Sequence, residues 1–239
     1  MSLLKSTFFT IFMLVWSMAY ALFLILTAPF FSLKNRFKLV FFYGQVILFM
    51  LQATCGLSHS VEGLENIPNE PHVALWKHGS SWEVFAQFLI GPPKVLVLKH
   101  ELLWIPFFGI GLKLLRSIAI HRGGGISAVN QVLNQGQARL AEGLSVLVFP
   151  EGTRMTEGET RRYGISGALL ASQAGCKLLP VAHDAAYYWP RRGLNKKKGV
   201  IRLIIGPPID ATGCDPRELN DQVQAWIEMT IKRIRREST

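Results

Sequence analysis

The stretch Lys77-His78-Gly79-Ser80-Ser81-Trp82-Glu83 stands where an apolar run, residues 72–76, gives way to a helical pattern. A histidine five residues before a carboxylate can place both side chains on one side of such a strand-to-helix turn. Glu83 would then accept the proton of one imidazole nitrogen and leave the other nitrogen free as a base. The same spacing also arises by chance, so the motif needs support from the rest of the chain.

Apolar runs rich in β-branched residues recur along the chain. They cover residues 73–76, 95–98, 117–120, 146–149, 178–181 and 200–205, and a short strand is predicted before them over residues 58–64. Helical patterns lie between them, and a last one covers residues 216–236, with an apolar face that we expect to dock on the domain. Continuous apolar strands separated by helices predict an α/β fold, with a mostly parallel sheet flanked by helices on both faces.

A second stretch, Phe149-Pro150-Glu151-Gly152-Thr153-Arg154, directly follows one of these strands. The two stretches, in this order and at this distance, resemble the lysophosphatidate acyltransferase family, the 1-acyl-sn-glycerol-3-phosphate acyltransferases of the glycerophospholipid acyltransferase superfamily. The family's third block, Phe-Pro-Glu-Gly-Thr-Arg, matches letter for letter. Its first block, Asn-His-x-Ser-x-x-Asp, has Lys77 here in place of Asn and Glu83 in place of Asp. Residues 118–122 and 178–182 resemble the second and fourth blocks.

The resemblance implies transfer of a fatty acyl group from a thioester, acyl-CoA or acyl carrier protein, to the sn-2 hydroxyl of 1-acyl-glycerol-3-phosphate, giving phosphatidate. It implies no cofactor besides this co-substrate and no metal. His78 is the expected general base, and Glu83 is expected to fix its tautomer and stabilise the imidazolium. Backbone amides and arginine forks suit the phosphate of the acceptor. The residues expected to bind it are Arg122, Glu151, Gly152, Thr153 and Arg154.

Two serines in the first stretch raise the alternative of a covalent intermediate. The chain lacks Gly-x-Ser-x-Gly, so we interpret Ser80 and Ser81 as caps of the following helix. His78 could instead be a structural histidine, an alternative that the accompanying blocks disfavour. Glutamate is one methylene longer than the usual aspartate, which leaves the geometry of the pair open.

The N-terminal part of the chain is predicted to be a membrane anchor. Residues 6–33 carry no charge, and about 20 apolar residues suffice to cross a bilayer as a helix. We expect a retained span over about residues 7–31 rather than a signal peptide, because apolarity continues past Ala19-Tyr20-Ala21. Lys34, Arg36 and Lys38 follow at once, which predicts a cytoplasmic location for the C-terminal side of the span.

A second apolar segment, residues 39–55, is interrupted by Gly44, Gln45 and Gln52 and is borderline for spanning. We interpret it as an interfacial or re-entrant helix that forms a hairpin with the first, with a second ordinary span as the alternative. A second span would place the rest of the chain away from cytosolic thioesters. The prediction is therefore an anchor, residues 1–56, and an acyltransferase domain, residues 57–239, facing the cytoplasm from the inner membrane.

A net charge of +10 favours anionic partners. No nucleic-acid-binding module accompanies the charge, so nucleic acid is not expected. The basic clusters, by default solvated loops, could meet membrane lipids, coenzyme A phosphates or an acyl carrier protein; they are Arg161-Arg162, Arg191-Arg192 and Lys196-Lys197-Lys198. Three scattered cysteines predict neither a metal site nor a disulfide framework. Two functional alternatives stay open, an acceptor such as lyso-ornithine lipid and a catalytically silent membrane-binding homologue.

Overall fold

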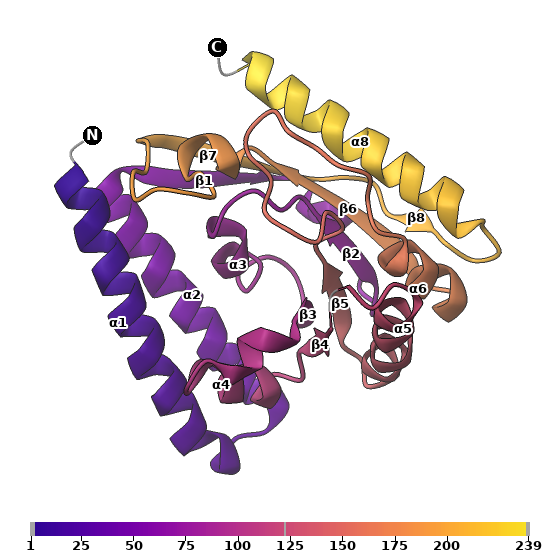
Figure 1. Ribbon diagram of the computed structural model, residues 1–239, viewed down its shortest axis with the longest axis horizontal. Coiled ribbons are helices and arrows are strands. Elements are labelled where there is room, and N and C mark those ends of the chain that lie inside the picture. Colours follow the sequence, from indigo (N-terminus) through magenta and orange to yellow (C-terminus); the bar gives the residue numbers. More distant parts are fainter. Residues whose placement is uncertain (1–2, 122, 238–239) are drawn as a thin grey trace.

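A mostly parallel β-sheet forms the middle layer of the structure (Figure 1). The computed structural model describes residues 3–121 and 123–237 of the 239-residue chain. The strands found there are β1 (Leu57–Glu62), β2 (Val73–Trp76), β3 (Lys94–Lys99), β4 (Ile118–Ile120), β5 (Ser145–Val148), β6 (Lys177–His183), β7 (Gly199–Ile205) and β8 (Ile209–Asp210). Their order is β1-β7-β6-β2-β5-β3-β4, with β8 beside β6. β7 and β8 run antiparallel to β6, and the other neighbours are parallel.

The central strands are buried along their length, as the continuous apolar runs predicted. Val73 of β2 lies between Val146 of β5 and Leu178 of β6, and all three side chains are fully buried. Strands that are covered on both faces have no solvent-facing side, which is why their sequences do not alternate with polar residues. The α/β class and the mostly parallel sheet are confirmed.

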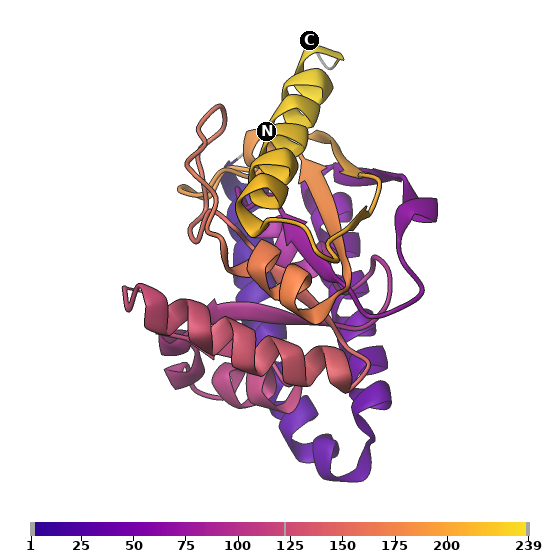
Figure 2. The ribbon, with the colours of Figure 1, turned by 90° about the vertical axis from the view of Figure 1, so that its right-hand side faces the viewer.

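Helices cover both faces of this sheet. On one side lie α1 (Leu3–Thr27), α2 (Leu33–Cys55), α3 (Trp82–Ala86) and α4 (Phe108–Leu114). On the other lie α5 (Ile126–Ala141), α6 (Ser166–Ala174) and α8 (Pro216–Glu237), which face the viewer in Figure 2. A short helix, α7 (Ala185–Tyr188), follows β6, and single 3-10 turns occupy Ala28–Phe30, Leu64–Asn66 and His100–Trp104.

The C-terminal helix α8 docks on the sheet with the apolar face that its sequence predicted. Leu219, Val223, Ile227 and Ile234 are buried, and the helix packs along β6 and α6. Asp215 begins the helix, because its carboxylate accepts hydrogen bonds from the amides of Arg217 and Glu218.

Helices α1 and α2 form an antiparallel hairpin. The Tyr20 hydroxyl donates to the Leu39 carbonyl at 2.6 Å, and the hydroxyls of Ser17 and Tyr43 lie 2.7 Å apart. Both helices are long and apolar enough to cross a membrane by length and composition. The second helix begins at Leu33 and so includes cationic residues that the prediction placed before it. One of these, Arg36, donates to the carbonyls of Ala28, Phe31 and Leu114 and ties the hairpin tip to α4.

The inward face of the hairpin packs against the rest of the chain at both of its ends. Near the N-terminus, the Phe9 ring meets the edge of Trp189 with ring centroids 5.5 Å apart, and the Lys196 ammonium donates to the Thr10 hydroxyl. Lys196 is thus buried, unlike the solvated loop residue that we expected. At the tip, Arg36 reaches α4. The hairpin and the sheet therefore share one hydrophobic core, although α2 ends at the left-handed Gly56 where the predicted anchor ends.

Candidate active site

The candidate site lies at the carboxyl ends of neighbouring parallel strands. His78 follows β2, Phe149 to Arg154 follow β5, and Lys99 ends β3, while β2, β5 and β3 are adjacent in the sheet. Parallel strands bring their carboxyl ends to one edge, which is where ligands bind in open α/β sheets. Residues that lie far apart in the sequence are thereby gathered around one opening.

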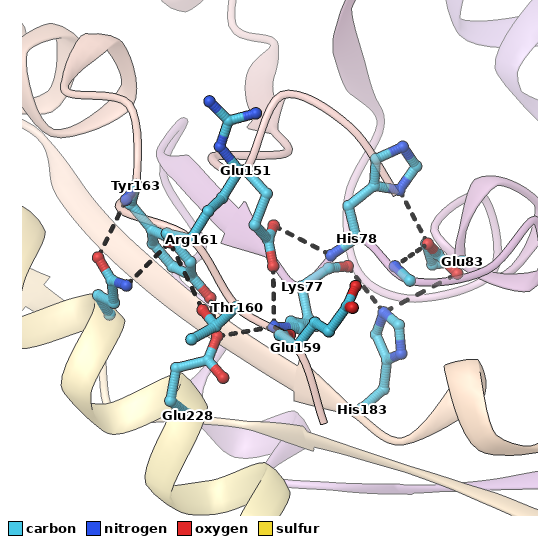
Figure 3. A network of polar contacts seen from close by, with 12 residues as sticks. Lys77, His78, Glu83, Glu151, Glu159, Thr160, Arg161, Tyr163, His183 and Glu228 are labelled. Atoms are coloured by element: carbon cyan, nitrogen blue, oxygen red, sulfur yellow. Dashed lines mark hydrogen bonds and ion pairs between the residues drawn. The ribbon is translucent and has the colours of Figure 1, made fainter. Parts of the chain in front are cut away.

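His78 and Glu83 meet as their spacing suggested. Nδ1 of His78 lies 2.9 Å from Oε1 of Glu83, in the turn between β2 and α3 (Figure 3). The same carboxylate oxygen accepts the amides of Gly79 at 2.9 Å and Ser80 at 2.8 Å. The extra methylene of glutamate is used to reach back from the first turn of α3 over these amides. Since a carboxylate only accepts, Nδ1 carries the proton and Nε2 is the basic nitrogen.

The electrostatics of this turn keep Glu83 ionised. Burial pushes the pKa of Glu83 upward, but the hydrogen bond from His78 and the nearby His183 outweigh it, so the pKa lies below its ordinary value. His183, at the end of β6, has its Nε2 4.0 Å from the second oxygen of Glu83. Burial lowers the pKa of His183, the Glu83 carboxylate pulls against that change, and Nε2 of His183 lies 2.8 Å from the Lys77 carbonyl oxygen.

The loop after β5 is joined to the histidine turn. The Phe149 ring stacks on the His78 imidazole with centroids 4.1 Å apart, and the Met155 amide donates to the His78 carbonyl at 2.7 Å. Gly152 has a positive φ of 67°, which favours glycine, and its amide donates to the Phe149 carbonyl within the turn. The Gly152 amide is thus engaged in the turn.

The two serines differ in what they do. Ser80 accepts a hydrogen bond from the Trp82 amide at 3.2 Å, a capping contact of the predicted kind. Ser81 occupies the N-cap position, but its side chain makes no capping bond, so that prediction was wrong. Its hydroxyl instead accepts from Nη1 of Arg154 at 2.6 Å, because the loop after β5 passes close to the start of α3.

Glu151 lies behind the histidine. Its side chain is buried, one carboxylate oxygen accepts the His78 amide at 3.2 Å, and the other lies 3.1 Å from Nζ of Lys77. Burial raises the pKa of Glu151 to about 7, while Lys77 pulls against that rise. This placement disfavours the direct contact with an acceptor phosphate that the resemblance implied. Arg122, the other residue given that role, lies outside the described residues.

A cavity of about 560 Å³ opens beside His78. Its apolar wall comes from the hairpin, β3 and α4, and includes Met13, Leu24, Val40, Leu98 and Leu112. Phe149, Thr153 and Arg154 line it near the histidine, together with two further cations, Lys99 and Arg191. Lys99 was not among the predicted site residues. The sequence signal that could have identified it is a basic residue at the end of an apolar strand.

Comparisons with known proteins identify related sequences. The model of a family described as Acyltransferase matches residues 58–184. The 1-acyl-sn-glycerol-3-phosphate acyltransferase of Pseudomonas aeruginosa is 41% identical over 213 residues, 87% of this chain and 82% of that protein. The 1-acyl-sn-glycerol-3-phosphate acyltransferase alpha of Homo sapiens is 26% identical over 181 residues, 73% of this chain and 63% of that protein.

A solved structure has the same fold. The crystal structure of the 1-acyl-sn-glycerophosphate acyltransferase PlsC from Thermotoga maritima superposes with a TM-score of 0.81, over 98% of this chain and 95% of that one. The sequences of the two chains are 21% identical, so this likeness speaks for the fold alone. With the family model and the Pseudomonas relative, the sequence resemblance is confirmed: this chain belongs to the lysophosphatidate acyltransferase family.

Proposed function

We propose that this protein transfers a fatty acyl group from an acyl thioester to the sn-2 hydroxyl of 1-acyl-glycerol-3-phosphate and so makes phosphatidate. The observation that carries the proposal is a histidine with its Nδ1 held by Glu83, at the opening of an apolar cavity flanked by cations. The cavity volume falls within the range of roughly 300–1,000 Å³ that is typical of small-molecule sites. The names of the relatives give the acceptor.

In the proposed reaction, Nε2 of His78 removes the proton of the acceptor hydroxyl as its oxygen attacks the thioester carbonyl. The tetrahedral intermediate then collapses, the carbon–sulfur bond breaks, and the imidazolium returns the proton to the leaving thiolate. Glu83 stabilises the imidazolium while it exists. A hydroxyl is a poor nucleophile until its proton is removed, so the base makes the attack possible at neutral pH.

The substrate contacts follow from the lining of the cavity. The acyl chain occupies the apolar part between the hairpin, β3 and α4. Arg154 binds the acceptor phosphate through its guanidinium, with Thr153 beside it, and Lys99 and Arg191 add positive charge at the same opening. Glu151 and Gly152 contribute by shaping the loop that presents Arg154. The exposed basic residues near the cavity are compatible with either thioester donor, acyl-CoA or acyl carrier protein.

The location of the enzyme is part of the proposal. We place it on the inner (cytoplasmic) membrane, facing the cytoplasm, where thioester donors are made. The outward face of the hairpin is apolar, with Phe8, Val15, Leu26 and Phe49 exposed. Because the rest of the chain packs against both ends of the hairpin, a hairpin that crossed the bilayer would draw the sheet into hydrocarbon. In place of the span that the sequence predicted over about residues 7–31, we therefore propose that both helices of the hairpin lie in the interface.

The test is acyl transfer by the purified full-length chain with a panel of lysolipid acceptors. We expect phosphatidate from 1-acyl-glycerol-3-phosphate, and a loss of roughly 10²–10⁴-fold in His78→Ala with the fold retained. A clear preference for lyso-ornithine lipid would overturn the acceptor and keep the reaction class. Equal activity of wild type and His78→Ala would overturn the mechanism, and no transfer to any acceptor would favour a silent homologue.

A further inference from the structure

Lys77, one of the two residues that depart from the family's first block, has its ammonium buried between two carboxylates. Only 6% of the residue is exposed. Nζ lies 3.1 Å from Oε1 of Glu151 and 2.7 Å from Oε1 of Glu228, and it also donates to the Glu159 carbonyl at 3.4 Å (Figure 3). Burying an ammonium costs free energy unless the charge is paired and hydrogen-bonded. The two carboxylates and the Glu159 carbonyl provide that pairing for Lys77.

The second carboxylate, Glu228, lies on the C-terminal helix α8. Asn220, Gln224 and Glu228 follow at four-residue spacing and share one face of α8. Asn220 donates to the Tyr163 carbonyl, and Gln224 accepts from the Tyr163 amide and donates to the Arg161 carbonyl. The Tyr163 hydroxyl donates to Oε1 of Glu228 at 2.9 Å. This polar face therefore binds the loop segment 161–163 and holds Glu228 opposite Lys77.

Glu151 connects Lys77 to His78, the proposed base. Glu151 faces Lys77 with one carboxylate oxygen and accepts the His78 amide at 3.2 Å with the other. The peptide between Lys77 and His78 is further fixed by His183, which bonds the Lys77 carbonyl at 2.8 Å. The backbone that carries the imidazole is thus held from both sides.

Lys77 and Glu228 depend on each other because their charges are opposite. Without the ammonium, the buried carboxylate of Glu151 and the partly exposed carboxylate of Glu228 would have no cation between them. Without Glu228, the ammonium would lose its shorter ion pair. The family model ends at residue 184, so Glu228 lies beyond the matched region, on a helix that the motif blocks do not include.

We propose that Lys77 and Glu228 are a positioning pair for the acyl transfer, in which Glu228 holds the Lys77 ammonium against Glu151 and thereby fixes the backbone of His78. The inference rests on the proposed function. Neither residue lines the cavity, so neither touches the substrate. The pair joins the C-terminal helix to the histidine turn through one continuous set of contacts.

The test is a double-mutant cycle in the full-length protein, with kcat and both Michaelis constants measured on 1-acyl-glycerol-3-phosphate. Lys77→Asn and Glu228→Gln should each lower kcat roughly tenfold or more with little change in either Michaelis constant, because the base moves while the cavity does not. The double variant should regain most of the lost kcat. It removes the Glu228 charge from beside Glu151, whose own carboxyl burial favours in the neutral form, and it restores the neutral residue of the family's first block beside the same glutamate.

The matched control is Glu157→Gln. Glu157 pairs with Arg235 of the same helix at 2.8 Å, so this change removes an ion pair between α8 and the same loop without touching Lys77. It should leave kcat within about twofold of wild type, as for most surface ion pairs. Thermal unfolding of all five proteins reports whether each one is folded.

Two results would overturn the positioning pair. One is a Glu228→Gln variant that loses no more kcat than Glu157→Gln. The other is a double variant whose loss equals the product of the two single losses, which would mean independent structural effects. A wild-type protein that is inactive on 1-acyl-glycerol-3-phosphate refutes the proposed acceptor instead, and the cycle is then measured on whichever acceptor of the panel supports turnover. If none does, both proposals fall.

Discussion

Nδ1 of His78 lies 2.9 Å from Oε1 of Glu83, and that oxygen also accepts two backbone amides of the same turn. One carboxylate oxygen thus fixes both the imidazole and the chain that carries it. Any change to Glu83 is therefore expected to act on the orientation of the base and on the shape of the turn together.

Replacing Glu83 separates charge from size. Glu83→Gln keeps the size but can present its NH2 to Nδ1 and favour the wrong tautomer. We expect kcat to fall by roughly 10²–10⁴-fold while the protein stays folded. Glu83→Asp keeps the charge but shortens the reach to the Gly79 and Ser80 amides, and should retain clearly more activity than the glutamine variant. Wild-type kcat in Glu83→Gln would remove Glu83 from the mechanism.

Arg154 can be tested together with the serine that holds it. Arg154→Lys keeps the charge and loses the planar fork, so the Michaelis constant for the lysolipid should rise strongly, with the constant for the thioester little changed. Ser81→Ala removes the acceptor of the 2.6 Å hydrogen bond and should shift the same constant in the same direction, but less. If neither variant changes that constant, Arg154 is part of the scaffold.

The position of the hairpin can be read from cysteine labelling. Asn35→Cys places an exposed thiol at the hairpin tip, and the native Cys214 is exposed on the rest of the chain. With Cys55 and Cys176 replaced by alanine, we expect an impermeant maleimide to label both sites only after the cells are opened. Labelling of residue 35 in intact spheroplasts, with Cys214 still protected, would instead show that the first helix crosses the membrane.

Glu151 should make stability depend on pH. Its pKa is raised from 4.5 in the unfolded chain to about 7 in the folded protein, mainly by burial. Between these values the unfolded chain has released the proton that the folded protein keeps, so rising pH favours unfolding. The contribution is on the order of 3 kcal/mol at its limit.

Glu151→Gln removes this titration. The melting temperature of the variant minus that of wild type should therefore increase between pH 5 and pH 8. A difference that stays constant, or that decreases, would mean that the ion pair with Lys77 outweighs burial.

The strands and the His78–Glu83 contact could be predicted from sequence because both are local. A strand that is buried on both faces is a continuous apolar run, and five residues of spacing suffice to bring a histidine and a carboxylate together across a tight turn. The start of α2 was missed because Lys34, Arg36 and Lys38 interrupt the apolar run, although a helix can carry such residues on its outer side. Arg36 has its own partners at the hairpin tip.

Other features of the site depend on contacts that no local pattern announces. Lys77 and Glu228 are 151 positions apart, and their meeting is decided by how α8 lies on the sheet. Glu151 belongs to a block that matches letter for letter, but a match does not say which side chains of the block face a ligand and which turn inward. Lys99 needed the strand order, since only that brings the end of β3 beside the end of β5.

The cavity beside His78 takes part of its wall from Met13, Tyr20 and Leu24 of the first helix and from Val40 and Tyr43 of the second. A truncated protein that begins at residue 57 would therefore lose part of the wall of this cavity as well as the two apolar helices. Water would reach the thioester, and hydrolysis would compete with lipid synthesis. Because we propose that the acyl chain occupies this cavity, a mutation selected in these helices for solubility is also expected to change which fatty acids the enzyme accepts.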